Sequence, residues 1–246
     1  MIGKLGRLPK KADPRTLQLA RYLSPTLPPI HLSTSWARLA TGDPPMFAND
    51  RIGDCTVAAL AHSLRICSSA AGNQIVVSDA DVLKVYSAIS GYDPDDPSTD
   101  RGAYCLDALK YVRTHGLGGH KIRAFAEIDP TDLRSIYATI DLFGTAYGGY
   151  GLPRSAQSQL VWDLSSGPDA APWSWGGHAM SETDHGPFAE NMATWGRLQT
   201  ATRAWGQRYR EESYAVIWDV WVPPAGLSPS GFDLAQMLED LEAVTR

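Results

Sequence analysis

Apolar residues recur at helical spacing in three segments of the first half of the chain. The first segment, residues 54–68, carries the i, i+3, i+4, i+7, i+10 stripe of a buried helix face. Residues 78–92 and 105–119 are predicted to form two further helices. Ser78 is a typical N-cap with an aspartate three residues later, and Gly116 is a typical helix end. The first half of the chain is therefore expected to be helical.

The pattern changes after residue 120, where short apolar runs bounded by turn residues are typical of strands. Strands are predicted for residues 121–129, 142–152, 176–184, 191–196 and 213–222. Helices are predicted for residues 130–144, 198–212 and 230–244, and the charged run 208–212 is interpreted as a solvated helix face. A helical half followed by a strand-rich half indicates an α+β fold with two lobes.

These patterns divide the chain into four stretches of one structural unit. Residues 1–48 are rich in proline and predict an extended arm that wraps the surface. Residues 49–120 are predicted to form the helical lobe and residues 121–225 the strand-rich lobe. Residues 226–246 are predicted to form a C-terminal amphipathic helix.

Composition narrows the class of protein. The 246 residues carry a net charge of -5 and no long run of lysine or arginine, so nucleic acid is not an expected partner. No apolar stretch approaches the roughly 18 residues of a membrane span, and no hydrophobic run follows the basic start as in a secretory signal. We therefore expect a cytoplasmic protein. Association with a virion, or delivery by another route, stays open.

Three cysteines do not make a disulfide framework, and whether Cys67 and Cys105 pair stays open. No nucleotide, flavin or metal motif is present, so no cofactor is expected. Asp54 is a plausible N-cap, which places Cys55 in the first turn of a helix, where the helix dipole lowers the pKa of a thiol. Thiol catalysis also needs an imidazole, and His178, which follows two glycines and opens a strand, is the best candidate.

Three blocks of sequence carry a family resemblance. The segments N-D-R-I-G-D-C-T-V-A-A-L-A-H (49–62), G-G-H-A-M (176–180) and A-T-W-G (193–196) resemble, in order, the signature blocks of papain-like cysteine peptidases. Those blocks are a glutamine six residues before a helix-opening cysteine, a G-H-A or D-H-A histidine, and an N-S-W-G segment. The match extends over roughly residues 45–222. It implies a papain-like two-lobe fold, with the nucleophile at a helix N-terminus in the first lobe and an antiparallel sheet or barrel as the second.

The resemblance also assigns roles. Cys55 matches the nucleophile, and His178 the general base that forms an ion pair with it. Asn49 takes the place of the oxyanion-hole glutamine, although its side chain is one methylene shorter. Trp195 matches the tryptophan that shields the third catalytic residue, and Trp195, Trp175 and Gly177 are expected to contact substrate.

The sequence departs from the family pattern at two positions. Ala193 stands where the family has its orienting asparagine, and alanine cannot orient an imidazole. Asn191 shares a strand face with it and is the first substitute, with Thr194 and Asp184 as other candidates. Asp54 places a carboxylate beside the thiol, which raises the pKa of the thiol unless the carboxylate turns outward as a cap.

Three functions are compatible with these residues. The first is a thiol hydrolase that cleaves peptide or related amide bonds through a Cys55 thioester, with His178 as base and a peptide or protein as substrate. The second is a catalytically silent papain-like scaffold that binds a protein partner, favoured by Ala193 and Asp54. The third is a peptidoglycan amidase or endopeptidase, or an acyltransferase, on the same fold. Only 54 residues precede Cys55, which is too few for a long inhibitory propeptide. In this respect the sequence resembles papain-like proteins of bacteria and their phages. Subsite specificity, oligomeric state and biological process are not indicated.

Overall fold

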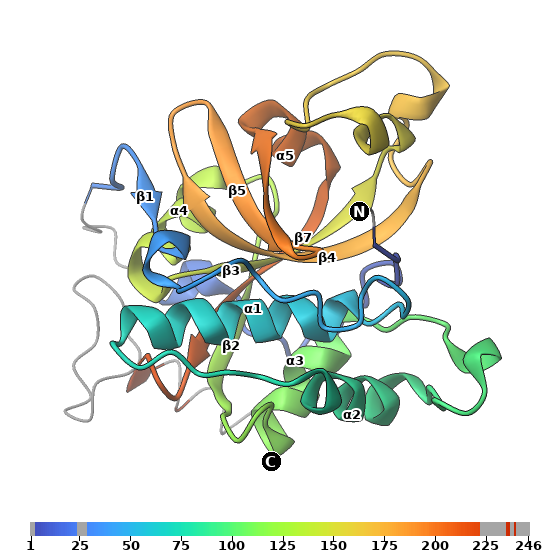
Figure 1. Cartoon of the computed structure of the whole chain (residues 1–246). Helices are drawn as coiled ribbons and strands as arrows, with labels where there is room; N and C mark the ends of the chain where they lie inside the picture. The colour runs from blue at the N-terminus through green and yellow to red at the C-terminus, as the bar shows by residue number, and fades with distance from the viewer. Residues whose placement is uncertain (1–2, 24–28, 222–234, 237–238, 240–246) are drawn as a thin grey trace.

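The computed structural model describes residues 3–23, 29–221, 235–236 and 239 of the chain (Figure 1). The predicted C-terminal helix lies almost entirely outside these described residues. The model has the predicted order, a helical lobe followed by a lobe built on an antiparallel sheet. No helix in the described part is long and apolar enough to cross a membrane.

The helical lobe contains the three predicted helices, with bounds α1 Cys55–Ala70, α2 Asp79–Ser90 and α3 Cys105–His115. The predicted start of α2 is confirmed, because the side chain of Ser78 and that of Asp81 each accept the backbone N–H of the other residue. The predicted end of α3 is confirmed at Gly116, whose φ of 92° favours glycine.

The sheet lobe is one antiparallel sheet in which the strands follow the order β2-β7-β3-β4-β5-β6, and a short strand β1 also pairs with β4. Its strands are β1 Thr34–Ser35, β2 Ile122–Ile128, β3 Ala146–Leu152, β4 Gly176–His185, β5 Ala189–Thr194, β6 Arg197–Thr202 and β7 Arg210–Trp218. The remaining α-helices are α4 Leu133–Phe143 and α5 Arg203–Tyr209. Short 3-10 helices occupy Leu19–Arg21, Ala37–Leu39, Pro97–Thr99, Arg154–Ser158 and Pro168–Ala170.

The single helix predicted for residues 198–212 is wrong. This segment instead completes β6, turns through the short helix α5 and enters β7. Thr202 begins α5, because its side chain accepts the backbone N–H of Trp205. The charged run 208–212 is therefore not a solvated helix face: Arg210 and Glu212 lie on β7 and are buried.

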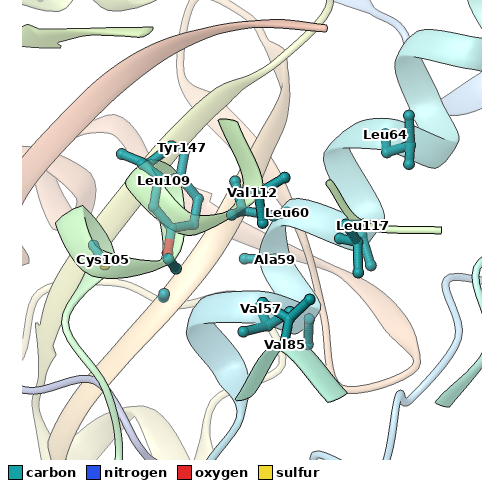
Figure 2. Packing of buried hydrophobic residues seen from close by; sticks show 14 of the residues in the cluster. Val57, Ala59, Leu60, Leu64, Val85, Cys105, Leu109, Val112, Leu117 and Tyr147 are labelled. Carbon is teal, nitrogen blue, oxygen red and sulfur yellow. The ribbon is translucent and has the colours of Figure 1, made fainter. Parts of the chain in front are cut away.

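The sheet separates two apolar layers, because successive residues of a strand point to opposite faces. On β7, Tyr214, Val216 and Trp218 pack toward the helical lobe, whereas Ala215 and Ile217 pack toward α4. Figure 2 shows the helical side, where side chains of the three helices meet in one cluster. Burying each such side chain contributes about 1.5–3 kcal/mol. The packing fixes α1 beneath the sheet, in contact with β4 (Figure 1).

Candidate active site

Cys55 is the first residue of α1 and is almost fully buried. The backbone N–H of Ala179, the residue after His178, lies near its thiol and lowers the pKa of that thiol. Asp54 does occupy the N-cap position, but its carboxylate does not cap the helix and is buried instead. The packing of α1 on the sheet therefore brings the sulfur against the start of β4, next to the histidine that the sequence selected.

His178 is held on β4 with one ring nitrogen anchored and the other free. Its Nε2 lies 2.6 Å from the hydroxyl of Thr194, and its ring stacks on Trp195 with centroids 4.1 Å apart. Its Nδ1 is buried and has no hydrogen-bond partner among the described residues. An imidazole fixed in this way presents Nδ1 as the nitrogen that can exchange a proton.

The partner of His178 is Thr194, whereas Asn191 was the first substitute expected from the sequence. Strand pairing supplies the reason, because Glu182 pairs with Met192 and alternation then places Thr194 on the same face as His178. Asn191 points to the opposite face. Its amide donates to Asp184 over 3.1 Å, and its carbonyl oxygen accepts from a threonine hydroxyl of β6.

Burial controls the charges of the site. It raises the pKa of the Cys55 thiol to about 12 and lowers the pKa of the His178 imidazole to about 3. It also raises the pKa of the Asp54 carboxyl to about 8. Both shifts favour the neutral forms of the thiol and the imidazole in this buried arrangement.

The start of the chain, residues 3–8, which we call the N-terminal strap, lies against this site. The backbone N–H groups of Gly6 and Arg7 both donate to the carbonyl of Gly177, directly before His178. On the other side, Leu8 donates to the carbonyl of Ala103, and Ala103 donates to the carbonyl of Gly6. The strap thus connects the sheet lobe at Gly177 with the helical lobe at Ala103, within the predicted N-terminal arm.

The strap also engages the residue expected to stabilise an oxyanion. The carbonyl of Lys4 accepts hydrogen bonds from the Asn49 side-chain amide over 3.2 Å and from the Trp195 indole over 3.3 Å. The Asn49 amide also donates to the carbonyl of Ile52 over 2.9 Å. Asn49 therefore reaches a carbonyl in the groove despite its short side chain, and that carbonyl belongs to the strap.

Two glycines allow the strap to lie this close. A Cβ at Gly6 would come within 1.8 Å of the carbonyl oxygen of Gly53, and one at Gly177 within 2.1 Å of the carbonyl oxygen of Arg7. Trp175, the remaining residue expected to contact substrate, packs against Trp195 with centroids 5.3 Å apart. Residues from both lobes and the strap are thus packed against one another at the site.

Other chemistry-bearing residues have structural roles. Cys67 and Cys105 are free, buried thiols. His62 is buried and its Nε2 lies 2.8 Å from the carbonyl of Pro45. Across the described residues, no three or more His, Cys, Asp or Glu side chains gather so as to hold a metal ion.

Sequence reasoning missed the strap and its anchor. The anchor is formed by Glu211 and Glu212, which bind the side chain of Arg7. The available signal was that Glu212 lies two residues before the continuous apolar run 214–218, which is typical of a strand buried on both faces. No local pattern marks residues 3–8 as a segment that returns to the centre of the molecule.

Comparisons with known proteins support the fold. No protein-family model matches the chain, and no curated protein matches it in sequence. Its structure is similar to xylellain, a cysteine protease from Xylella fastidiosa, at a TM-score of 0.66 and 15% identity over 87% of this chain and 96% of that one. A cysteine protease of Carica candamarcensis gives a TM-score of 0.56 at 15% identity, over 76% and 99% of the two chains. A procathepsin B of Trypanosoma congolense gives 0.61 at 10% identity, over 88% and 86%. The helical lobe, the antiparallel sheet and these similarities together show that the chain has the papain-like cysteine protease fold.

Proposed function

We propose that the chain is a thiol protease whose nucleophile is Cys55 and whose general base is His178, held latent by the N-terminal strap. One observation carries this proposal. His178 has its Nε2 bound to Thr194 and its Nδ1 free, while the N–H of the next residue, Ala179, lies near the thiol. A nucleophile, an imidazole beside it and a third group that orients the imidazole are the parts that acyl transfer needs.

The reaction begins when the strap leaves and the groove becomes hydrated. The pKa values of Cys55 and His178 then return toward their ordinary ranges, because burial is what displaces them. The Cys55 proton passes to Nδ1 of His178, and the thiolate attacks the carbonyl carbon of the substrate. The imidazolium next protonates the leaving amine as the C–N bond breaks, and a thioester forms on Cys55. Water, deprotonated by His178, then hydrolyses the thioester and releases the acid.

Negative charge on the substrate oxygen is stabilised by donors already present at the site. The Asn49 amide, which now binds the Lys4 carbonyl, becomes free for the substrate when the strap leaves. The backbone N–H of Cys55 lies in the first turn of α1, where N–H groups have no partner within the helix. Thr194 holds the imidazole in one orientation throughout.

A strap variant tests this proposal in the full-length chain. Gly6→Val should dislodge the strap, because a Cβ at position 6 collides with the backbone at Gly53. We expect the rate of Cys55 alkylation by iodoacetamide at pH 6 to rise at least tenfold, read by mass spectrometry. We also expect cleavage of an unfolded protein substrate to appear, and to vanish in Gly6→Val/Cys55→Ala and Gly6→Val/His178→Ala.

Gly186→Ala is the matched control, because a Cβ at Gly186 meets nothing closer than 3.6 Å. It should leave both alkylation and cleavage unchanged. Rapid alkylation without cleavage of protein or peptide would contradict protease function and favour a silent scaffold. Clearing of cell-wall preparations without cleavage of protein would favour a peptidoglycan amidase. If the alkylation rate does not rise in Gly6→Val, the proposal that the strap keeps the Cys55 thiol unreactive is contradicted.

A further inference from the structure

A cavity of about 490 Å³ lies at the end of β4 that is remote from His178. Its walls are the loop 31–39, the end of β4 with the turn that follows, and β5. Asp184, on its wall, comes six residues after His178, which is about 20 Å along an extended strand. The cavity is therefore separate from the candidate active site, and its volume is typical of a site for a small organic ligand.

An irregularity of the sheet brings Asp184 to the wall of this cavity. The pairing of β4 with β5 shifts between Glu182 and Asp184, so that Asp184 pairs with Asn191. On its other side β4 pairs with β1, which places Ser35 opposite Asp184. Such a bulge interrupts the alternation of a strand and re-aims a side chain. Asp184 thereby becomes a carboxylate that lines a cavity and is only 4% exposed.

The Asp184 carboxylate has no cation beside it among the described residues. Its Oδ1 accepts from the backbone N–H of Ala37 over 3.1 Å, and its Oδ2 accepts from the Asn191 amide over 3.1 Å. Both donors are neutral, so the charge of the carboxylate is not compensated, and a carboxylate has lone pairs for further donors. The position therefore favours a ligand that brings a positive charge.

Arg38 brings the opposite charge to the same cavity. It lies in the short 3-10 helix Ala37–Leu39 and is exposed. Within the described part of the chain its guanidinium has no hydrogen bond and no ion pair, unlike Arg7 and Arg210, which each meet two glutamates. Arg38 and Asp184 therefore line one cavity without pairing with each other.

The remaining polar wall is fixed by contacts of its own. The Nε2 of His185 lies 2.8 Å from Asp141, and its ring stacks on Tyr137 with centroids 4.4 Å apart. Asp141 also accepts from the Thr34 hydroxyl and from the backbone N–H of His31. Asp141 is thus engaged by the protein itself, which leaves Asp184 as the carboxylate that can meet a ligand.

We infer that this cavity binds a short peptide whose amino and carboxyl ends are both free. Arg38 binds the carboxylate end, because a guanidinium meets a carboxylate through two parallel hydrogen bonds. Asp184 binds the ammonium end, and Trp36 and Leu39 offer apolar surface to a side chain. The volume exceeds that of a single amino acid, so a dipeptide is the shortest ligand that fills it. Binding there requires neither the Cys55 thiol nor release of the strap.

Three dipeptides, titrated by calorimetry into the full-length chain, test both ends of the ligand. They are leucyl-alanine, acetyl-leucyl-alanine, in which the amine is blocked, and leucyl-alanine amide, in which the carboxyl is blocked. We expect leucyl-alanine to bind at least tenfold more tightly than either blocked peptide. Equal binding of the acetylated peptide would show that the cavity takes any anion, and equal binding of the amide that it takes any cation. Either result, or no binding of leucyl-alanine, would overturn the inference.

Two variants locate the binding. Arg38→Met should weaken binding of leucyl-alanine at least tenfold and leave that of the amide unchanged, because the amide has no carboxylate. Asp184→Asn should weaken leucyl-alanine likewise and leave the acetylated peptide unchanged; if it does not fold, the acetylated peptide on the unmodified chain decides the same point. Arg51→Met, at a side chain that is 73% exposed and outside the cavity, is the control. Undiminished binding in Arg38→Met would place the peptide elsewhere and overturn the inference.

Discussion

Two buried arginines of this protein have nearly the same surroundings and different attachments. Arg210 lies between Glu182 and Glu190, at 2.9 and 2.7 Å, with its guanidinium over the ring of Tyr150. Arg7 likewise lies between two glutamates and over an aromatic ring. The partners of Arg210 are on β4 and β5, in the same sheet as Arg210 itself. Arg7, in contrast, belongs to the strap, outside that sheet.

The same arrangement of charges can therefore hold strands of one sheet together, as at Arg210, or hold a separate segment against the sheet, as at Arg7. Arg210 cannot leave its glutamates unless the strands of the sheet separate. Arg7 can leave with residues 3–8, which are held by a few backbone hydrogen bonds and side-chain contacts. The carboxylates around Arg210 are also more deeply buried, because Glu182 and Glu190 are each 1% exposed whereas Glu211 is 32% exposed, so the buried charges cost more at Arg210.

The first prediction compares how much each of the two arginines contributes to the free energy of unfolding. Arg210→Ala leaves two glutamates buried without a cation and should lower the free energy of unfolding by about 3–5 kcal/mol. Arg7→Ala should lower it by only about 1–3 kcal/mol, because its glutamates become hydrated when the strap moves. Urea unfolding followed by tryptophan fluorescence measures both. Equal losses would show that the strap is as much part of the scaffold as β7.

The second prediction concerns Asp54, a buried carboxyl that has no ion-pair partner among the described residues. Burial raises its pKa to about 8, from an ordinary value of 3.8. Between these values the folded protein retains a proton that the unfolded chain releases. The contribution of Asp54 to stability should therefore fall as pH rises from 4 to 8, by about 1.4 kcal/mol per pH unit, whereas buried His178 and His62, whose pKa values are lowered, contribute in the opposite direction below pH 6.5.

Asp54→Asn should remove this slope and stabilise the protein most at the alkaline end. Urea unfolding at pH 5 and pH 8 gives the difference, and Asp50→Asn, an exposed position four residues earlier, is the control. A slope that persists in Asp54→Asn would show that other groups carry the pH dependence. A buried carboxyl that is neutral at pH 7 differs from the glutamates that meet Arg7 and Arg210, which have cations beside them.

The smallest expected effect concerns the orientation of His178. In the Gly6→Val background, Thr194→Val removes the partner of Nε2 and should lower kcat/KM about tenfold, which corresponds to about 1.4 kcal/mol. Thr200→Val, which removes a hydroxyl bonded to Asn191, should change kcat/KM less than twofold. Thr194→Asn should retain most of the activity. If kcat/KM falls more in Thr200→Val than in Thr194→Val, the residue that orients His178 is Asn191 and not Thr194.

Local patterns were sufficient to predict the helical lobe and most strands. The capping box at Ser78 and the stop at Gly116 depend only on neighbouring residues, so sequence alone located both. The segment 198–212 was predicted wrongly, because its helix-forming residues are interrupted by a strand that exists only through pairing with β5. Pairing of strands distant in sequence is not encoded in the period of one segment.

The same limit applies to the site. Cys55 and His178 were identified because each sits in a short motif. The choice between Asn191 and Thr194 depends on the register of β4 against β5, which fixes the face that each side chain occupies. Glu212 was missed because its partner lies 205 residues away. A buried charge has no local signature when its counterion comes from the other end of the chain.

The position of Gly3 has a practical consequence for anyone preparing the protein. A Cβ at this residue would come within 2.1 Å of the Trp195 indole, so a polypeptide fused before the described part of the chain is attached at a point packed against Trp195. A purification tag there is tethered by a few residues, which gives it a millimolar local concentration at the site. The choice of the terminus that carries the tag therefore affects the alkylation rate and the activity measured for the unmodified protein.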